Sequence, residues 1–229
     1  MGTDINMIAE VRRNGVWELS TAKVFKNPWY DPASDKNWAM EEYMSQPDDS
    51  RNYNLFAILA GVRNGEGFAG CRTGERFKPI ADLKGYPADM SKNDVLFGDE
   101  YGYGSWLTLR ELHEYDWEQL HRKYGYVDET TYRDYIMKGK QPNSYSGDIW
   151  GRNIIKLTET EMVDLINGEY PRDESKEYYT ACYFAPITYR ECADWFYDET
   201  MKGLRRLIPD GGTEDDVRIV FEFDCRRKD

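Results

Sequence analysis

The chain has 229 residues, with 42 acidic and 30 basic side chains, a formal net charge of −12 and 15% aromatic residues. The 40% hydrophobic content is ample to bury a core, and the many aromatic residues argue against a disordered chain. No stretch approaches the roughly 20 consecutive apolar residues of a membrane-spanning helix. The acidic balance argues against general nucleic-acid binding, which needs clustered Lys and Arg.

The N-terminus has no basic region followed by an apolar run, so the sequence predicts a cytoplasmic protein without a secretion signal. Its cysteines are dispersed and form no C-x-x-C pair, which predicts reduced and mostly buried thiols. They are Cys71, Cys182, Cys192 and Cys225. Cys182 and Cys192 are the pair that a strand-to-helix turn would bring together.

Residues 4–11 alternate apolar and polar side chains, which predicts a half-buried strand. Asn14-Gly15 is typical of a tight hairpin turn and leads into a second strand through Trp17 and Leu19. Residues 26–50 contain three prolines and predict a loop with a short helix over 35–44. The apolar block 54–62 predicts a buried helix, and the glycines of residues 61–104 predict long loops.

Three capping boxes predict three helix starts in the second half of the chain, at Thr108, Thr158 and Thr188. The first helix is expected to run to about Lys123, the second to end at Gly168 and the third to be long and to stop at Pro209. A short helix is also expected near 131–137. Residues 178–185 and 217–224 predict strands on either side of the third helix, which suggests a crossover unit.

These elements predict one α+β domain over residues 1–229. Its sheet is expected to be mixed or mostly antiparallel, with an N-terminal hairpin, a C-terminal strand, several helices and long loops rich in Gly and Tyr. The segment 124–151 is rich in Tyr, Gly, Asn and Ser, and we interpret it as an insertion or lid.

The first candidate site is a ligand-binding surface around the predicted turn 99–106, where glycines and aromatic residues precede a capped helix. Such a turn suits a nucleotide base and phosphate, with basic residues of the 63–78 loop supplying charge. Further tyrosines at 124, 126, 132, 135 and 145 would add stacking surface. The competing interpretation is that these aromatic residues close a small core. The predicted ligand-binding residues are Asp4, Asn6, Arg63, Arg72, Tyr101, Tyr103, Ser105 and Trp106.

The second candidate site is the polar face of the opening strand, where carboxylates would hold a divalent cation or perform acid–base chemistry. An enzyme of this kind would use Asp4, Glu10, His113 and Asp224. The competing interpretation is a solvated strand face. His113 and His121, predicted on one helix, would lie about 12 Å apart along its axis and so would not share a metal ion. Apart from this cation, no cofactor is expected.

The third candidate is the acidic surface, which would bind a protein partner or simply provide solubility. Its longest run is Glu214-Asp215-Asp216. Shorter runs lie at residues 41–42, 48–49 and 173–174.

Four blocks of the sequence together resemble a known group. They are Met1–Asn6, Asn54–Asn64, Ser105–Leu112 and Val217–Asp224. The chain resembles uncharacterised bacteriophage and prophage proteins that open Met-Gly-Cys-Asp-Ile-His, although Thr3 and Asn6 replace the Cys and His and Tyr103 stands where related loops tend to hold His. The resemblance implies an accessory protein of an infected bacterium and no known activity.

The leading functional hypothesis is therefore a phage accessory protein that binds a small polar, nucleotide-like ligand and sequesters a host defence signal. The alternatives are a metal-assisted phosphoester hydrolase and an acidic inhibitor that binds a host protein.

Overall fold

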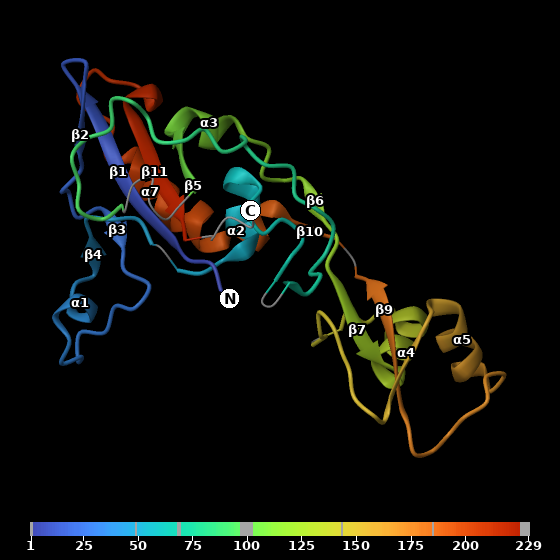
Figure 1. The fold of residues 1–229 in the computed structure, drawn as a ribbon. Coiled ribbons are helices and arrows are strands. Elements are labelled where there is room, and N and C mark those ends of the chain that lie inside the picture. Colours follow the sequence, from blue (N-terminus) through green and yellow to red (C-terminus); the bar gives the residue numbers. More distant parts are fainter. Residues whose placement is uncertain are drawn as a thin grey trace.

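The computed structural model describes residues 2–48, 50–67, 70–96, 103–142, 144–184 and 186–224. It confirms the predicted α+β class, with mostly antiparallel sheets (Figure 1). The strands are β1 Ile5–Arg13, β2 Val16–Leu19, β3 Phe25–Lys26, β4 Tyr43–Met44, β5 Tyr103–Thr108, β6 Leu120–His121, β7 Tyr124–Asp128, β8 Ile154–Leu157, β9 Glu177–Tyr183, β10 Ile187–Thr188 and β11 Val217–Phe223. The helices are α1 Asn37–Met40, α2 Tyr53–Ala60, α3 Leu109–Glu114, α4 Glu129–Lys138, α5 Glu159–Asn167, α6 Tyr189–Cys192, a π-helix at Phe196–Thr200, α7 Met201–Arg205 and a 3-10 turn at Glu214–Asp216.

The largest sheet has the strand order β2-β1-β11-β5, and all its pairs are antiparallel. The predicted hairpin is confirmed: Asn14 and Gly15 have φ of 51° and 80°, the left-handed values that a two-residue hairpin turn needs. The predicted C-terminal strand is also confirmed. As β11 it lies in the middle of the sheet, between β1 and β5.

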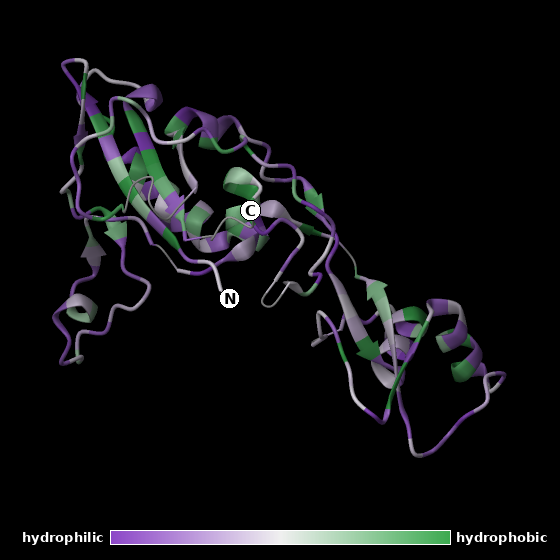
Figure 2. Cartoon of the chain, in the orientation of Figure 1, coloured by the Kyte–Doolittle hydropathy of each residue, from purple (hydrophilic) through white to green (hydrophobic). Residues whose placement is uncertain are grey.

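One face of this sheet forms the main core, which includes Met7, Ile219 and Phe221. Helix α2 packs into this core, as its apolar sequence predicts, and is capped by Asn52, whose side chain accepts hydrogen bonds from two backbone amides. Figure 2 shows the apolar residues gathered on β1, β11 and the helices beside them.

The other face of the sheet carries the polar side chains of β1 and β11, and part of it is covered. A segment of residues 84–96, which we call the strap, crosses it (Figure 1). Glu10 under the strap is fully buried. The interpretation of this face as exposed to solvent is therefore wrong for Glu10.

A smaller sheet of order β7-β9-β8 has its own hydrophobic cluster, which includes Val127, Met162 and Tyr178. Strands β7 and β9 are antiparallel, whereas β8 and β9 are parallel. Helices α4 and α5 contact this sheet, and Figure 1 shows the group beyond the end of the larger sheet. The segment 124–151 therefore contributes β7 and α4 to this group, and its proposed motion as a lid stays a prediction.

All three predicted capping boxes are present, but two helix lengths differ from expectation. Helix α3 ends at Glu114 instead of near Lys123: Tyr115 has extended backbone angles, the indole of Trp117 donates to the Leu112 carbonyl, and the chain then turns into β6. His113 and His121 are consequently not on one helix. The expected long helix after Thr188 is split into α6, the π-helix and α7.

The structure also corrects two further expectations, one about strand pairing and one about a helix length. Strands β9 and β11 lie in different sheets, so no crossover unit joins them. The helix expected over 35–44 is only the four residues of α1. Cys182 and Cys192 are buried free thiols, Cys71 is a half-buried one, and Cys225 lies outside the described residues.

Candidate functional site

Two surfaces of the molecule each gather several cations over aromatic rings. The first, which we call the ladder, crosses the strap-covered face of the large sheet. The Arg218 guanidinium carbon lies 4.0 Å from the ring centre of Trp17 and 5.7 Å from that of Trp106. Arg12 lies 5.4 Å from Trp17, and the Lys84 amine lies 4.2 Å from Trp106.

Every cation of the ladder is neutralised by a carboxylate. Arg218 pairs with buried Glu10 at 2.7 Å and with Asp89 at 2.9 Å. Arg12 pairs with Asp216 at 2.8 Å, and Lys84 pairs with Glu111 at 2.5 Å. A cleft of about 720 Å³ lies beside the ladder, lined by both tryptophans and Arg218. Because its charges are already matched, we interpret the ladder as a structural network that holds the strap on the sheet.

The second surface lies on the small sheet, and it follows from strand alternation. Val127, Thr180 and Cys182 point into the cluster beneath α4 and α5, so the residues between them point the other way. Those residues include Tyr124, Tyr126 and Tyr183, and all three are half-buried. Tyr124 pairs with Tyr183 across β7 and β9, and their ring centres are 5.3 Å apart.

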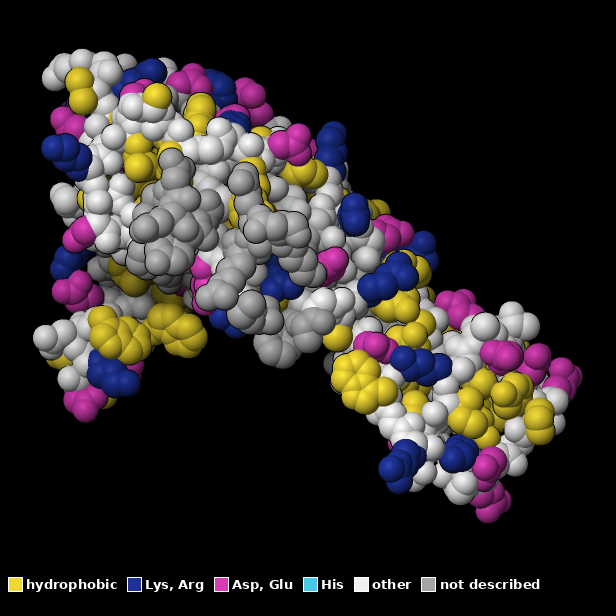
Figure 3. Space-filling view, in the orientation of Figure 1, with side chains coloured by type: hydrophobic (Ala, Val, Ile, Leu, Met, Phe, Trp, Pro, Cys, Tyr) yellow, Lys and Arg dark blue, Asp and Glu magenta, His cyan; other side chains and the backbone are white. Residues whose placement is uncertain are grey.

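Three cations lie over these rings. Arg72 is 4.8 Å from the ring centre of Tyr124, Arg122 is 5.0 Å from that of Tyr183 and Lys156 is 5.0 Å from that of Tyr126. Residues 73–75 hydrogen-bond to residues 122–124 beside β7, and this pairing places Arg72 next to Tyr124. We call the six side chains the tyrosine face. Figure 3 shows hydrophobic and basic side chains intermixed where β7 and β9 join the rest of the molecule.

The charges of the tyrosine face are only partly neutralised. Lys156 pairs with Asp148 at 2.6 Å, and Arg122 lies 3.6 Å from Glu75 with both side chains about half exposed. Arg72 donates to the Tyr183 hydroxyl at 3.1 Å, and no carboxylate within the described ranges pairs with it. Burial, with the neighbouring Tyr126 hydroxyl, raises the pKa of Tyr124 to about 12, so this ring stays neutral at physiological pH.

The residues predicted to bind a ligand do not form one site. Asp4, just before β1, pairs with Arg51 at 2.5 Å. Asn6, within β1, donates to Glu222 at 3.0 Å. Arg63 donates to Thr3 at 2.9 Å.

The turn expected around 99–106 is strand β5 from residue 103 onward, because residues 103–108 pair with β11. Ser105 is buried, Trp106 belongs to the ladder and Tyr103 packs against the main core. Tyr101 lies outside the described residues. Arg72 alone of the predicted set reaches the tyrosine face.

The residues predicted for a metal-assisted hydrolase are also dispersed. Asp4 and Asp224 meet at one end of the β1–β11 pair, where Asp224 accepts from the Asp4 amide at 2.5 Å. Glu10 is committed to Arg218 toward the other end, and His113 pairs with Glu214 at 2.7 Å. In the part of the chain that the structure describes, no three His, Cys, Asp or Glu side chains are grouped to hold a metal ion.

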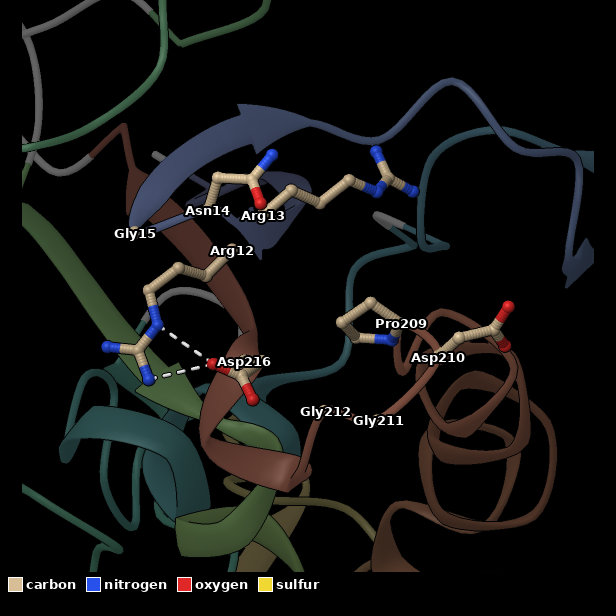
Figure 4. A pocket seen from close by; sticks show the side chains of 9 residues that line it. All are labelled: Arg12, Arg13, Asn14, Gly15, Pro209, Asp210, Gly211, Gly212 and Asp216. Atoms are coloured by element: carbon tan, nitrogen blue, oxygen red, sulfur yellow. Dashed lines mark hydrogen bonds and ion pairs between the residues drawn. The ribbon is translucent and has the colours of Figure 1, made fainter.

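The longest acidic run serves the fold. Glu214 binds His113, Asp215 binds Arg110 at 2.8 Å and Asp216 binds Arg12. Figure 4 shows the polar notch of about 430 Å³ next to this run, where Arg12 reaches Asp216 while Arg13 points away from it. The charges of Arg12 and Asp216 neutralise each other, so this pair offers no unpaired charge to a ligand.

Sequence reasoning named Tyr124, Tyr126 and Arg72 but missed Tyr183, Arg122 and Lys156. The alternation of β7 and β9 would have identified Tyr183 as a residue on the same face as Tyr124, given the pairing of the two strands. Arg72 and Arg122 lie outside the strands and Lys156 lies on the neighbouring strand β8, so only the tertiary structure shows that the three cations share one face.

Comparison of the chain with protein-family models, with curated proteins and with solved structures finds no match. The resemblance to phage proteins therefore stays a prediction. None of the helices in the described ranges is both long enough and apolar enough to cross a membrane.

Proposed function

We propose that this protein binds a nucleotide-like ligand, with a planar base and a phosphate, on the tyrosine face. Tyrosine rings and arginine guanidinium planes both stack on bases, and guanidinium groups also bind phosphate. The observation that carries the proposal is Arg72, which is fixed against two tyrosines and has no carboxylate partner among the described residues. The ladder has the same residue types, but its cations are neutralised.

The size and charge of the tyrosine face favour a mononucleotide or a short oligonucleotide over duplex DNA. It contains three cations in a chain with a net charge of −12. Three phosphate contacts would give a dependence of log K on log salt with a slope of about −2 for a single strand. Binding without turnover would fit the hypothesis that a phage accessory protein sequesters a host defence signal.

The test is calorimetric titration of the protein with mononucleotides, cyclic nucleotides, cyclic dinucleotides and short single-stranded oligonucleotides. We expect Arg72→Ala and Tyr124→Ala each to weaken binding by about 10-fold or more, since base stacking contributes about 1–3 kcal/mol per base. The matched control is Arg133→Ala, which removes an exposed arginine of the same group that lies on α4 and pairs with Glu129. Absence of heat with the whole panel at high protein concentration would refute the proposal, and so would equal weakening by Arg133→Ala.

A further inference from the structure

Residues 27–44, which we call the tryptophan arm, expose large apolar side chains far from the tyrosine face. Trp29 is 61% exposed and Trp38 is 57% exposed, and Met40 and Tyr30 are exposed at 49% and 43%. Figure 1 shows α1 at the tip of a protrusion on the opposite side of the molecule from β7 and β9, and Figure 3 shows hydrophobic side chains gathered there. Four exposed apolar side chains so close in the chain are more than the scattered exposure that a surface normally shows.

The base of the arm is anchored in the main core. Phe25 in β3 is 1% exposed, and it packs so closely on Gly203 of α7 that a methyl group at Gly203 would lie 2.5 Å from its ring. Arg206 donates to the Val24 carbonyl, and Lys26 lies 5.7 Å from the ring centre of Trp195. The direction in which the arm leaves the body is therefore fixed.

The backbone within the arm is held by Asn27, which is 2% exposed. Its side chain donates to the carbonyls of Trp38 at 2.7 Å and Glu41 at 2.9 Å, and accepts from the Trp29 amide at 2.9 Å. The Asp31 amide closes the loop by donating to the Ala39 carbonyl at 2.8 Å. The backbone that carries both tryptophans is therefore ordered by one buried asparagine. Such preorganisation lowers the entropy cost of binding.

The charges around these aromatic residues are mainly acidic. Residues 29–42 contain four carboxylates and one lysine, a net charge of −3. Glu41 pairs with Lys23, and Lys36 lies 5.7 Å from the ring centre of Trp38. Asp35 and Glu42 are exposed, and no side chain that the structure describes forms an ion pair with either of them.

We propose that the tryptophan arm is a docking element for a folded protein that has an apolar pocket rimmed by Lys and Arg. Tryptophan and tyrosine are enriched among the residues that dominate binding energy at protein interfaces, and the acidic rim would steer a basic partner. A second copy of this chain fits poorly, since it would bring two acidic arms together. An anionic membrane surface fits poorly for the same electrostatic reason.

The test compares the native protein with Trp29→Ala/Trp38→Ala, and with Trp150→Ala as the matched control. Trp150 is 75% exposed and lies outside the arm. Each protein is immobilised and exposed to a bacterial lysate. A protein retained by the native chain and the control, but not by the double variant, is then identified, purified and titrated directly. The double variant should keep its thermal midpoint, because both side chains are mainly exposed.

The proposal predicts that the purified partner binds the native chain and Trp150→Ala equally and the double variant at least about 30-fold more weakly. Asp35→Lys/Glu42→Lys should slow association about 10-fold at low salt and less at high salt. Hydrogen exchange should show protection within residues 27–44 on binding. Nucleotide titration should be unchanged in the double variant, so this proposal and the proposed function can fail separately.

Several results would overturn the proposal. One is that no retained protein distinguishes the double variant from the control. Another is that the native chain self-associates in sedimentation experiments and the double variant does not, which would make a second copy the occupant. Loss of binding to phosphatidylglycerol vesicles in the double variant alone would make a membrane the occupant.

Discussion

At the scale of single residues, Arg218 shows how the polar face of the large sheet is stabilised. Its side chain is 3% exposed and that of Glu10 is fully buried, so neither charge is compensated by water. Glu10 also accepts from the Ser91 amide at 2.6 Å, which ties the strap to β1. A buried ion pair with complete hydrogen bonding is tolerated, but either partner alone is costly.

Arg218→Ala is therefore expected to lower the free energy of unfolding by about 3–5 kcal/mol, because it leaves the Glu10 carboxylate buried and unpaired. The measurement is equilibrium unfolding in urea. Arg110→Ala is the control, since its ion pair with Asp215 is partly exposed and should contribute about 1 kcal/mol or less. Glu10→Leu/Arg218→Met should recover at least half of the loss. Equal effects of the two single substitutions would contradict this account.

His121 gives a second prediction at this scale. It is 3% exposed, it stacks on Phe77 with ring centres 3.9 Å apart, and its Nδ1 has no hydrogen-bond partner among the residues that the structure describes. Burial, with Lys123 nearby, lowers the pKa of His121 from 6.5 to about 4. The unfolded chain therefore takes up a proton at a higher pH than the folded chain does.

Stability that depends on neutral His121 should be complete above pH 6.5 and should be lost as the pH falls from 6.5 to about 4. The loss is at most about 3 kcal/mol. It is measured as the difference between the pH dependence of unfolding of the native protein and of His121→Phe, which cancels the contribution of the carboxylates. Identical pH profiles for the two proteins would show that His121 does not remain neutral in the folded state.

At the scale of secondary-structure elements, local sequence signals correctly predicted the helix starts and the hairpin turn. They did not predict where helices end or which strands pair. The Asn14-Gly15 hairpin and the three Thr-x-x-Glu boxes depend on neighbouring residues, and the structure contains all of them. The end of α3 is marked by the extended backbone of Tyr115, and no Gly or Pro lies between Glu114 and Lys123 to predict it.

The strap is an element that the sequence did not predict. Its contacts at Glu10, Gly104, Arg218 and Glu222 come from three different strands, so they exist only once the register of the sheet is known. The Tyr86 hydroxyl donates to Glu222, and its ring lies against Gly104. A methyl group at Gly104 would lie 2.7 Å from that ring.

Gly104→Ala is accordingly expected to displace Tyr86 and loosen the strap, at a cost of about 1–3 kcal/mol in the free energy of unfolding. Hydrogen exchange should rise within residues 84–96. In a Tyr86→Ala background the same substitution should cost less than about 1 kcal/mol, because the collision is gone. Equal costs in the two backgrounds would show that Tyr86 is not the neighbour that makes glycine necessary.

At the scale of the whole molecule, the proposed activities lie on parts that are spatially separate. The large sheet and its ladder form a self-neutralised scaffold, and the tyrosine face and the tryptophan arm project on opposite sides of it (Figure 1). Composition indicated that aromatic residues would carry function, but it also drew attention to Trp106 and Tyr103, which belong to the scaffold. Whether a ring of this chain lies beside a neutralised cation, as in the ladder, or beside Arg72, which has no carboxylate partner among the described residues, depends on tertiary structure.

The most direct test of the central claim is an NMR titration of protein labelled in its tyrosine rings, with the nucleotide that gives the largest heat. We predict saturable shift changes at Tyr124, Tyr126 and Tyr183, with none at Tyr86 beside the ladder cleft. Shift changes at Tyr86 without changes at those three tyrosines would contradict the assignment of the ligand to the tyrosine face.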